Sequence, residues 1–180
     1  SACLEYWCHW ASMQSPVLSV SKSCYVHLHN ISRIKKFLDQ SSHERVVLAV
    51  ITTKLDYCNS LLCGAPTSLT NKLLRIQNIA ARIIIGSGNR QHITPVLKSL
   101  HWLPIHQRIK FKTLILVYKA VHNQALEYLQ ELVHIHAPSW GLRSSDKNFL
   151  TVPLTRSSVI QNCAFSVAGP RLWNTLPLSL

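Results

Sequence analysis

Carboxylates that could hold a catalytic metal are few and scattered in this sequence. A two-metal site needs at least two carboxylates that converge on Mg²⁺ to bind the attacking and leaving oxygens. The acidic residues are Glu5, Asp39, Glu44, Asp56, Glu127, Glu131 and Asp146, with no Asp-Asp pair and no Asp-x-Asp. Asp56 is open to a metal role, but we favour the interpretation that it is a helix residue paired with a nearby basic group. The sequence therefore predicts no catalytic residue and no bound cofactor.

The cysteines and histidines suggest zinc by number but not by spacing. Structural zinc sites combine close pairs such as Cys-x2-Cys with a second pair downstream. Cys3 and Cys8, like Cys58 and Cys63, are separated by four residues and lack a matching second pair. We expect Cys58 and Cys63 to be small buried hydrophobes, and we expect no metal site.

Basic residues dominate the charge. The 180 residues include 19 Lys and Arg against 7 Asp and Glu, a net charge of +12. No acidic residue occurs from Tyr57 to Leu126, a stretch that carries Lys72, Arg75, Arg82, Arg90, Lys98, Arg108, Lys110, Lys112 and Lys119. Such a surface attracts polyanions, and nucleic acid is the expected partner. A membrane surface or an acidic protein is the competing interpretation.

Six of these cations are the predicted nucleic-acid-binding residues. Lys72, Arg75 and Arg82 fall within about 80° on one expected helix, at 100° per residue. Arg108, Lys112 and Lys119 form a stripe on another, about 120° from its apolar face. Phosphate contact requires only well-placed cations, whereas the alternative is a solvated helix face. Trp102 and Trp173 could stack on bases, although we favour core positions beside prolines.

The elements that position these residues are expected to be helices. We predict helices over residues 22–38, from Ser41 (in a Ser-x-x-Glu capping box), over 68–85, from Thr94-Pro95, over 105–122 and over 125–133. Gly64, Pro66 and the Gly86 region are stop signals. The predicted core residues are Leu69, Leu73, Ile76, Ala80 and Ile83 in one helix, and Phe111, Leu114, Tyr118 and Val121 in another. Segments 149–154 and 164–168 are expected to be strands or extended.

The predicted fold class is mainly α, a helical bundle-like domain followed by an irregular, short-strand C-terminal segment. Residues 1–20 are an unplaced N-terminal tail, 21–136 a helical region and 137–180 a truncated segment punctuated by Pro and Gly. No apolar run approaches the ~18–20 residues of a membrane span, and no secretory signal is recognised. We expect an intracellular protein, nuclear or cytoplasmic, that is not secreted and has no membrane or small-molecule partner.

Several sequence blocks resemble one family. Residues 54–66 (KLDYCNSLLCGAP), 71–82 (NKLLRIQNIAAR), 92–104 (HITPVLKSLHWLP), 142–146 (LRSSD) and 164–174 (AFSVAGPRLWN) follow in order. They are similar to the region after the palm, on the thumb side, of the reverse transcriptases of LINE-type (non-LTR) retrotransposons. Lys54 departs from the usual Arg, and Cys63 falls at a variable position.

The resemblance implies a helical thumb-side fragment of an RNA-directed DNA polymerase from a transposable element. Thumb regions of this kind hold the template–primer duplex, so RNA, DNA or their hybrid is the implied partner. The missing polymerase region is a second candidate partner. Mg²⁺ would belong to the missing palm, and the fragment is expected not to be an enzyme. The alternatives are a helical protein-interaction module and a decayed open reading frame without selected function.

Overall fold

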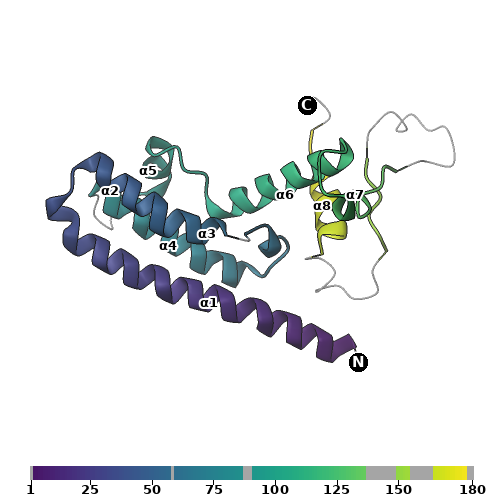
Figure 1. Cartoon of the computed structure of the whole chain (residues 1–180), viewed down its shortest axis with the longest axis horizontal. Coiled ribbons are helices and arrows are strands. Elements are labelled where there is room, and N and C mark those ends of the chain that lie inside the picture. The colour runs from purple at the N-terminus through teal and green to yellow at the C-terminus, as the bar shows by residue number, and fades with distance from the viewer. Residues whose placement is uncertain (1, 58, 87–90, 137–148, 155–163, 178–180) are drawn as a thin grey trace. The chain divides into compact units, whose positions relative to one another are not determined.

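The computed structural model describes residues 2–57, 59–86, 91–136, 149–154 and 164–177, and these residues are mainly helical (Figure 1). In this described part, the only β-pairing is an isolated antiparallel bridge between Ile135 and Leu150. The predicted mainly α fold class is therefore confirmed. The chain forms two compact units, which are residues 1–59 with 65–108, and residues 60–64 with 109–180. The domain division expected at residues 20 and 136 stays a prediction.

Helix α1 (Ala2–Ile34) is 33 residues long. The sequence placed the start of this helix at Lys22 and left residues 1–20 unplaced, and that start is wrong. A stripe of buried residues on α1 begins before Lys22 and recurs at steps of four and three residues, so the part of the helix that packs also begins before Lys22. Its members are Val17, Ser21, Cys24, Leu28 and Ile31.

A short 3-10 turn, η1 (Lys35–Phe37), leads to a helical run made of α2 (Gln40–Val47), the π-helical turn η2 (Leu48–Thr52) and α3 (Thr53–Asp56). The start of α2 was predicted near Ser41, but the capping residue is Asp39. Its carboxylate accepts hydrogen bonds from the backbone N–H groups of Ser41 and Ser42 at 3.1 and 3.2 Å. An Asp at this position satisfies two N–H groups that have no partner within the helix.

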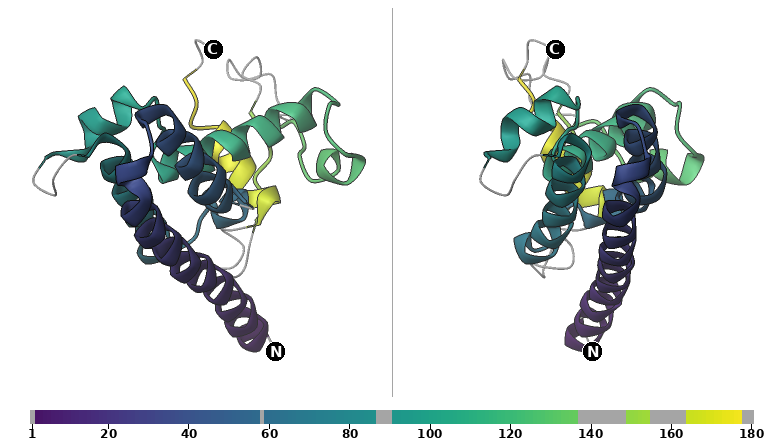
Figure 2. Two further views of the ribbon diagram at one scale, coloured as in Figure 1. Left: turned by 60° about the vertical axis from the view of Figure 1, so that its left-hand side comes forward. Right: turned by 90° about the vertical axis from the view of Figure 1, so that its left-hand side faces the viewer.

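Helix α4 (Thr67–Ile85) is the centre of the first unit. It packs against α1, α2 and α5 (Ile93–Ser99), as Figures 1 and 2 show. Its buried residues are Leu69, Thr70, Leu73, Ile76, Gln77, Ala80, Ala81 and Ile84. Ile84 is therefore the buried residue at the end of the seam, and the prediction of Ile83 is wrong by one position.

The ends of α4 follow the stop signals in the sequence. Gly64 and Gly86 both have positive φ, at 79° and 73°, a conformation that glycine adopts without steric cost. Gly86 is the left-handed C-cap, and its N–H donates to the carbonyl of Arg82. The N-cap is Pro66, where Thr67 or Ser68 was expected. The helix ends at the predicted residue and begins one residue before the predicted start at 68.

Helix α5 begins two residues earlier than predicted. Its N-cap is His92, whose ring Nδ1 accepts a hydrogen bond from the Thr94 N–H at 3.4 Å. Thr94 was expected to be the cap itself, and that prediction is wrong. The helix ends at Ser99, and His101 has a positive φ of 54° as the chain turns toward Trp102.

Helix α6 (Ile105–Val121) has the predicted bounds to within a residue. Its predicted apolar face is wrong. Phe111 and Tyr118 are 57% and 49% exposed, whereas Ile109, Thr113 and Val117 are buried. Thr113 is accommodated because its hydroxyl donates to the carbonyl of Ile109 at 2.9 Å. Ile109, Thr113 and Val117 are β-branched residues at four-residue steps, and Ala120 is buried as well.

The second unit also contains α7 (Glu127–Gln130) and α8 (Phe165–Trp173). The expected extended segment at 164–168 is wrong, because four of its residues lie in α8. Helix α7 is much shorter than the helix predicted over 125–133. The Asn174 side chain donates to the Leu150 carbonyl and accepts from the Leu150 N–H, both at 2.9 Å. This pair of bonds attaches the segment 149–154 to the end of α8.

No helix among the described residues is long and apolar enough to cross a membrane.

Candidate nucleic-acid interface

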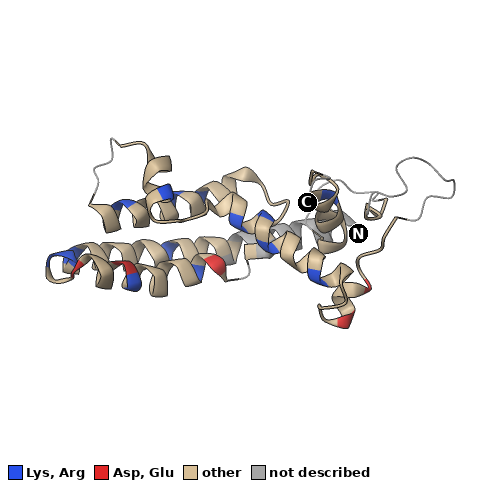
Figure 3. Cartoon of the chain, turned by 90° about the horizontal axis from the view of Figure 1, so that it is seen from above, with Lys and Arg blue, Asp and Glu red and all other residues tan. Residues whose placement is uncertain are grey.

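Lys72 and Arg75 are the most accessible of the predicted binding residues in the first unit. Both are exposed on α4, and they lie three residues apart, so their side chains are neighbours on one helix face. Lys98 on α5, outside the predicted set, is also exposed. Neither α4 nor α5 contains an acidic residue, and Figure 3 shows this contrast with the mixed charges of α2 and α3. A phosphate approaching α4 therefore meets no opposing carboxylate from α4 or α5.

Arg82, the third predicted cation of α4, is half-buried. Its Nη2 donates to the Gln91 carbonyl at 3.4 Å, and its Nε is buried with no hydrogen-bond partner among the described residues. Arg82 is thus directed toward the segment that precedes α5. Its contribution to nucleic-acid binding stays a prediction.

Arg108 forms an ion pair with Asp56. One guanidinium nitrogen, Nη1, lies 3.0 Å from both oxygens of the carboxylate, and the two side chains are 16% and 32% exposed. Arg108 Nε also donates to the Leu103 carbonyl at 3.0 Å, and Asn59 donates to Asp56 at 3.1 Å. The prediction that Asp56 pairs with a nearby basic group is confirmed. The ion pair with Asp56 therefore fixes the Arg108 guanidinium within the first unit. The phosphate contact expected of Arg108 stays a prediction.

The second unit carries the remaining two predicted residues on α6. Lys119 is exposed, and Lys112 is half-buried. Lys110 is exposed as well, although it was not among the predicted set. Two exposed lysines outside the predicted set are Lys98 and Lys110. The sequence identifies them only as members of the stretch without acids, because exposure depends on which helix face packs.

The two cysteines whose side chains are described are buried, and the two described tryptophans are buried or half-buried. Cys24 and Cys63 are buried free thiols, and burial raises the pKa of each thiol above its ordinary value. The expected burial of Cys63 is confirmed, whereas Cys58 lies outside the described residues. Trp102 is 7% exposed, which confirms its expected core position, and Trp173 is half-buried. Among the described residues, no group of three His, Cys, Asp or Glu side chains could hold a metal ion.

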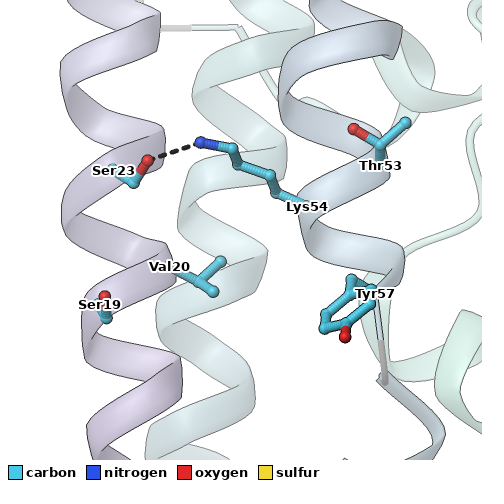
Figure 4. A pocket seen from close by; sticks show the side chains of 6 residues that line it. All are labelled: Ser19, Val20, Ser23, Thr53, Lys54 and Tyr57. Carbon is cyan, nitrogen blue, oxygen red and sulfur yellow. Dashed lines mark hydrogen bonds between the residues drawn. The ribbon is translucent and has the colours of Figure 1, made fainter.

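A groove of about 370 Å³ lies between α1 and α3, within the first unit. It is lined by Ser19, Val20, Ser23, Thr53, Lys54 and Tyr57. Figure 4 shows the Lys54 side chain reaching from α3 to Ser23 on α1. Lys54 Nζ lies 2.7 Å from Ser23 Oγ and 2.8 Å from His27 Nε2. Sequence patterns alone predict no role for Lys54, because its contacts with Ser23 and His27 depend on the packing of α1 against α3.

Comparisons with known proteins add no relative. No protein-family model matches the chain, and no curated protein or solved structure is similar to it.

Proposed function

We propose that this chain is a catalytically incomplete, thumb-side fragment of a LINE-type retrotransposon reverse transcriptase. It binds template–primer nucleic acid without sequence preference, through the basic faces of its helices. A nuclear or cytoplasmic location belongs to the same proposal. The observation that carries it is the absence of acidic residues from Tyr57 to Leu126 beside nine Lys and Arg residues, two of which stand exposed and adjacent on α4.

The exposed pair Lys72 and Arg75 supports the proposal by its position. Each cation that neutralises a phosphate releases condensed counterions, and this release supplies most of the free energy of non-specific binding. The helix brings the two cations to neighbouring positions on one solvated surface, so they can contact adjacent phosphates of one strand. Arg108, by contrast, has its charge compensated by Asp56.

The test compares the double variant Lys72→Ala/Arg75→Ala with a matched control, Arg33→Ala/Lys36→Ala. The control removes the same charge from exposed positions at the end of α1 and in η1. Affinity for an RNA–DNA hybrid is measured between about 50 and 200 mM salt. We expect the α4 variant to bind more weakly at every salt concentration. Its log–log salt slope should be smaller by about 1.8, two phosphate contacts at about 0.9 each. Equal losses in both variants would show that only net charge matters and would refute a defined face.

One observation favours the alternative of a helical protein-interaction module. Phe111, Ile115 and Tyr118 are exposed on α6, at 57%, 37% and 49%. An exposed apolar face of this kind marks an interaction surface when it is contiguous. This alternative would be supported if the chain self-associates at high salt and does not bind nucleic acid. The double variant Phe111→Ser/Tyr118→Ser should then lose the self-association.

A further inference from the structure

The groove between α1 and α3 offers a second set of groups suited to nucleic acid, away from the exposed face of α4. Its volume of about 370 Å³ lies in the range of about 300–1,000 Å³ typical of small-ligand sites. Its polar groups are hydroxyls and one ammonium, from Ser19, Ser23, Thr53, Tyr57 and Lys54. No carboxylate lines it, so its chemistry favours an anionic ligand.

Lys54 supplies charge and an unused donor. An ammonium has three N–H donors, and Ser23 Oγ and His27 Nε2 take two of them. His27 Nε2 can accept from Lys54 in the tautomer with the proton on Nδ1, and neither partner is a carboxylate. Among the described residues, no carboxylate forms an ion pair with Lys54. The half-buried positive charge is therefore uncompensated.

Ser23 adds a second donor at the same point. Its oxygen accepts from Lys54, which leaves its own proton free to donate. The third N–H of Lys54 and the O–H of Ser23 can therefore both reach one anionic oxygen. This pairing of a cation with an adjacent hydroxyl suits a phosphate.

Tyr57 forms the other end of the groove. It follows α3 in an extended conformation and is 80% exposed. Figure 4 shows its ring on the same side of the helices as Val20, below Lys54 in that view. An exposed aromatic ring beside a cation is the arrangement on which single-stranded nucleic acids stack their bases.

We propose that the groove holds one nucleotide unit, with its phosphate at Lys54 and Ser23 and its base on the Tyr57 ring. The inference rests on the proposed function, because a strand already held by the basic helix faces is one source of this unit. A free mononucleotide is the other source. Because Lys54→Arg keeps the positive charge, this variant should retain binding.

The test uses two readouts on the whole chain. The first is NMR of ring-labelled tyrosine, with the Tyr57 signal assigned through Tyr57→Phe, during titration with thymidine monophosphate, thymidine or inorganic phosphate. The second is the affinity for an oligothymidylate of about 12 nucleotides, a length within the range of single-strand site sizes. Lys54→Met and Tyr57→Ala are compared with the exposed-lysine control Lys36→Met, and circular dichroism verifies that each variant is folded.

We expect the Tyr57 signal to shift with thymidine monophosphate and to shift much less with thymidine alone or inorganic phosphate alone. Tyr57→Ala should weaken oligonucleotide binding roughly fivefold or more, the low end of the loss of one stacked base. Lys54→Met should lower the salt slope by about 0.7, one single-strand phosphate contact. Lys54→Arg and Lys36→Met should leave the slope near that of the wild type.

The outcomes separate the two proposals. Suppose that Lys54→Met and Tyr57→Ala bind the oligonucleotide as the wild type does, and that the Tyr57 signal does not shift. This result overturns the proposal that the groove holds a nucleotide and leaves the proposed function standing. A Tyr57 shift with the monophosphate but no binding of oligonucleotide or hybrid supports the groove and overturns the proposed function. Equal responses to inorganic phosphate and to the monophosphate overturn the assignment of a nucleotide.

Discussion

Gln77 is a buried polar side chain that links α4 to the beginning of α6 within the first unit. It is 1% exposed. Its Nε2 donates to the Leu103 carbonyl at 2.8 Å, and its Oε1 accepts from the Ile105 N–H at 2.9 Å. Because Ile105 is the first residue of α6, its N–H has no partner within the helix. Gln77 therefore acts as the cap of α6 from a distant part of the sequence.

The substitution Gln77→Met keeps most of the side-chain volume and removes both hydrogen bonds. The buried Ile105 N–H is then left without a partner, which costs about 1–3 kcal/mol. The Leu103 carbonyl keeps the hydrogen bond from Arg108, so its loss is only the net value of one bond, about 0.5–1.5 kcal/mol. We expect a total destabilisation of about 2–4 kcal/mol.

Urea unfolding followed by far-ultraviolet circular dichroism measures this loss. With a slope of about 2 kcal/mol per molar urea, the middle of the usual range, the midpoint should fall by roughly 1–2 M. Native-state hydrogen exchange should show that the Ile105 amide loses protection. The control is Gln107→Met at an exposed position of the same unit, with a change within about 0.5 kcal/mol. Equal stability of Gln77→Met and Gln107→Met would refute the capping role of Gln77.

Three further predictions concern other buried groups. Asp56→Asn leaves the Arg108 charge without its partner and should cost about 1–3 kcal/mol, between exposed and fully buried pairs; a double-mutant cycle with Arg108→Met that gives no coupling would contradict this. Gly169→Ala would place a Cβ 2.7 Å from Val117 Cγ2, and this overpacking should cost about 1–3 kcal/mol in thermal unfolding; Val117→Ala in the same chain should restore most of the loss, and no restoration would argue against the clash. Burial lowers the pKa of His43 in the folded protein. The contribution of neutral His43 to the free energy of unfolding is therefore fully present above the pKa of the unfolded chain, about 6.5, and is lost as the pH falls through the pKa of the folded state. A His43→Gln variant whose stability has the same pH dependence between about pH 7 and 5 would refute this.

The helices that the sequence predicted best are those whose ends carry backbone constraints. The bounds of α4 follow from Gly64, Pro66 and Gly86, and α6 begins directly after Pro104. These signals are local, because a positive φ or a missing N–H is a property of one residue. The first half of α1 has no such signal and no clear period before Val17, so the sequence could not place it.

The buried face of α6 could not be predicted because composition favoured the wrong residues. Phe111 and Tyr118 are large and aromatic, so the sequence pattern predicts them in the core, whereas the helix buries Ile109, Thr113 and Val117. Thr113 satisfies its own hydroxyl through the Ile109 carbonyl, so it can be buried without a distant partner. Which of two apolar faces packs depends on tertiary contacts.

The candidate interface was predictable in its charge but not in its accessibility. The stretch without acids directs attention to α4, α5 and α6, and Lys72 and Arg75 are exposed on α4. The pairing of Arg108 with Asp56 spans 52 positions, so the sequence could state only that Asp56 has a basic partner nearby. The groove at Lys54 depends on the packing of α1 against α3, and two of its lining residues, Ser19 and Val20, precede the helix predicted from residue 22.

The central claim is that basic helix faces bind nucleic acid through phosphate contacts. The most direct measurement is the affinity of the wild-type chain for an RNA–DNA hybrid as a function of salt concentration. We expect log affinity to decrease linearly with log salt concentration. The slope should be about −1.8 or steeper, because the exposed pair Lys72 and Arg75 alone accounts for about −1.8. A slope near zero, or no binding at about 50 mM salt, would contradict it.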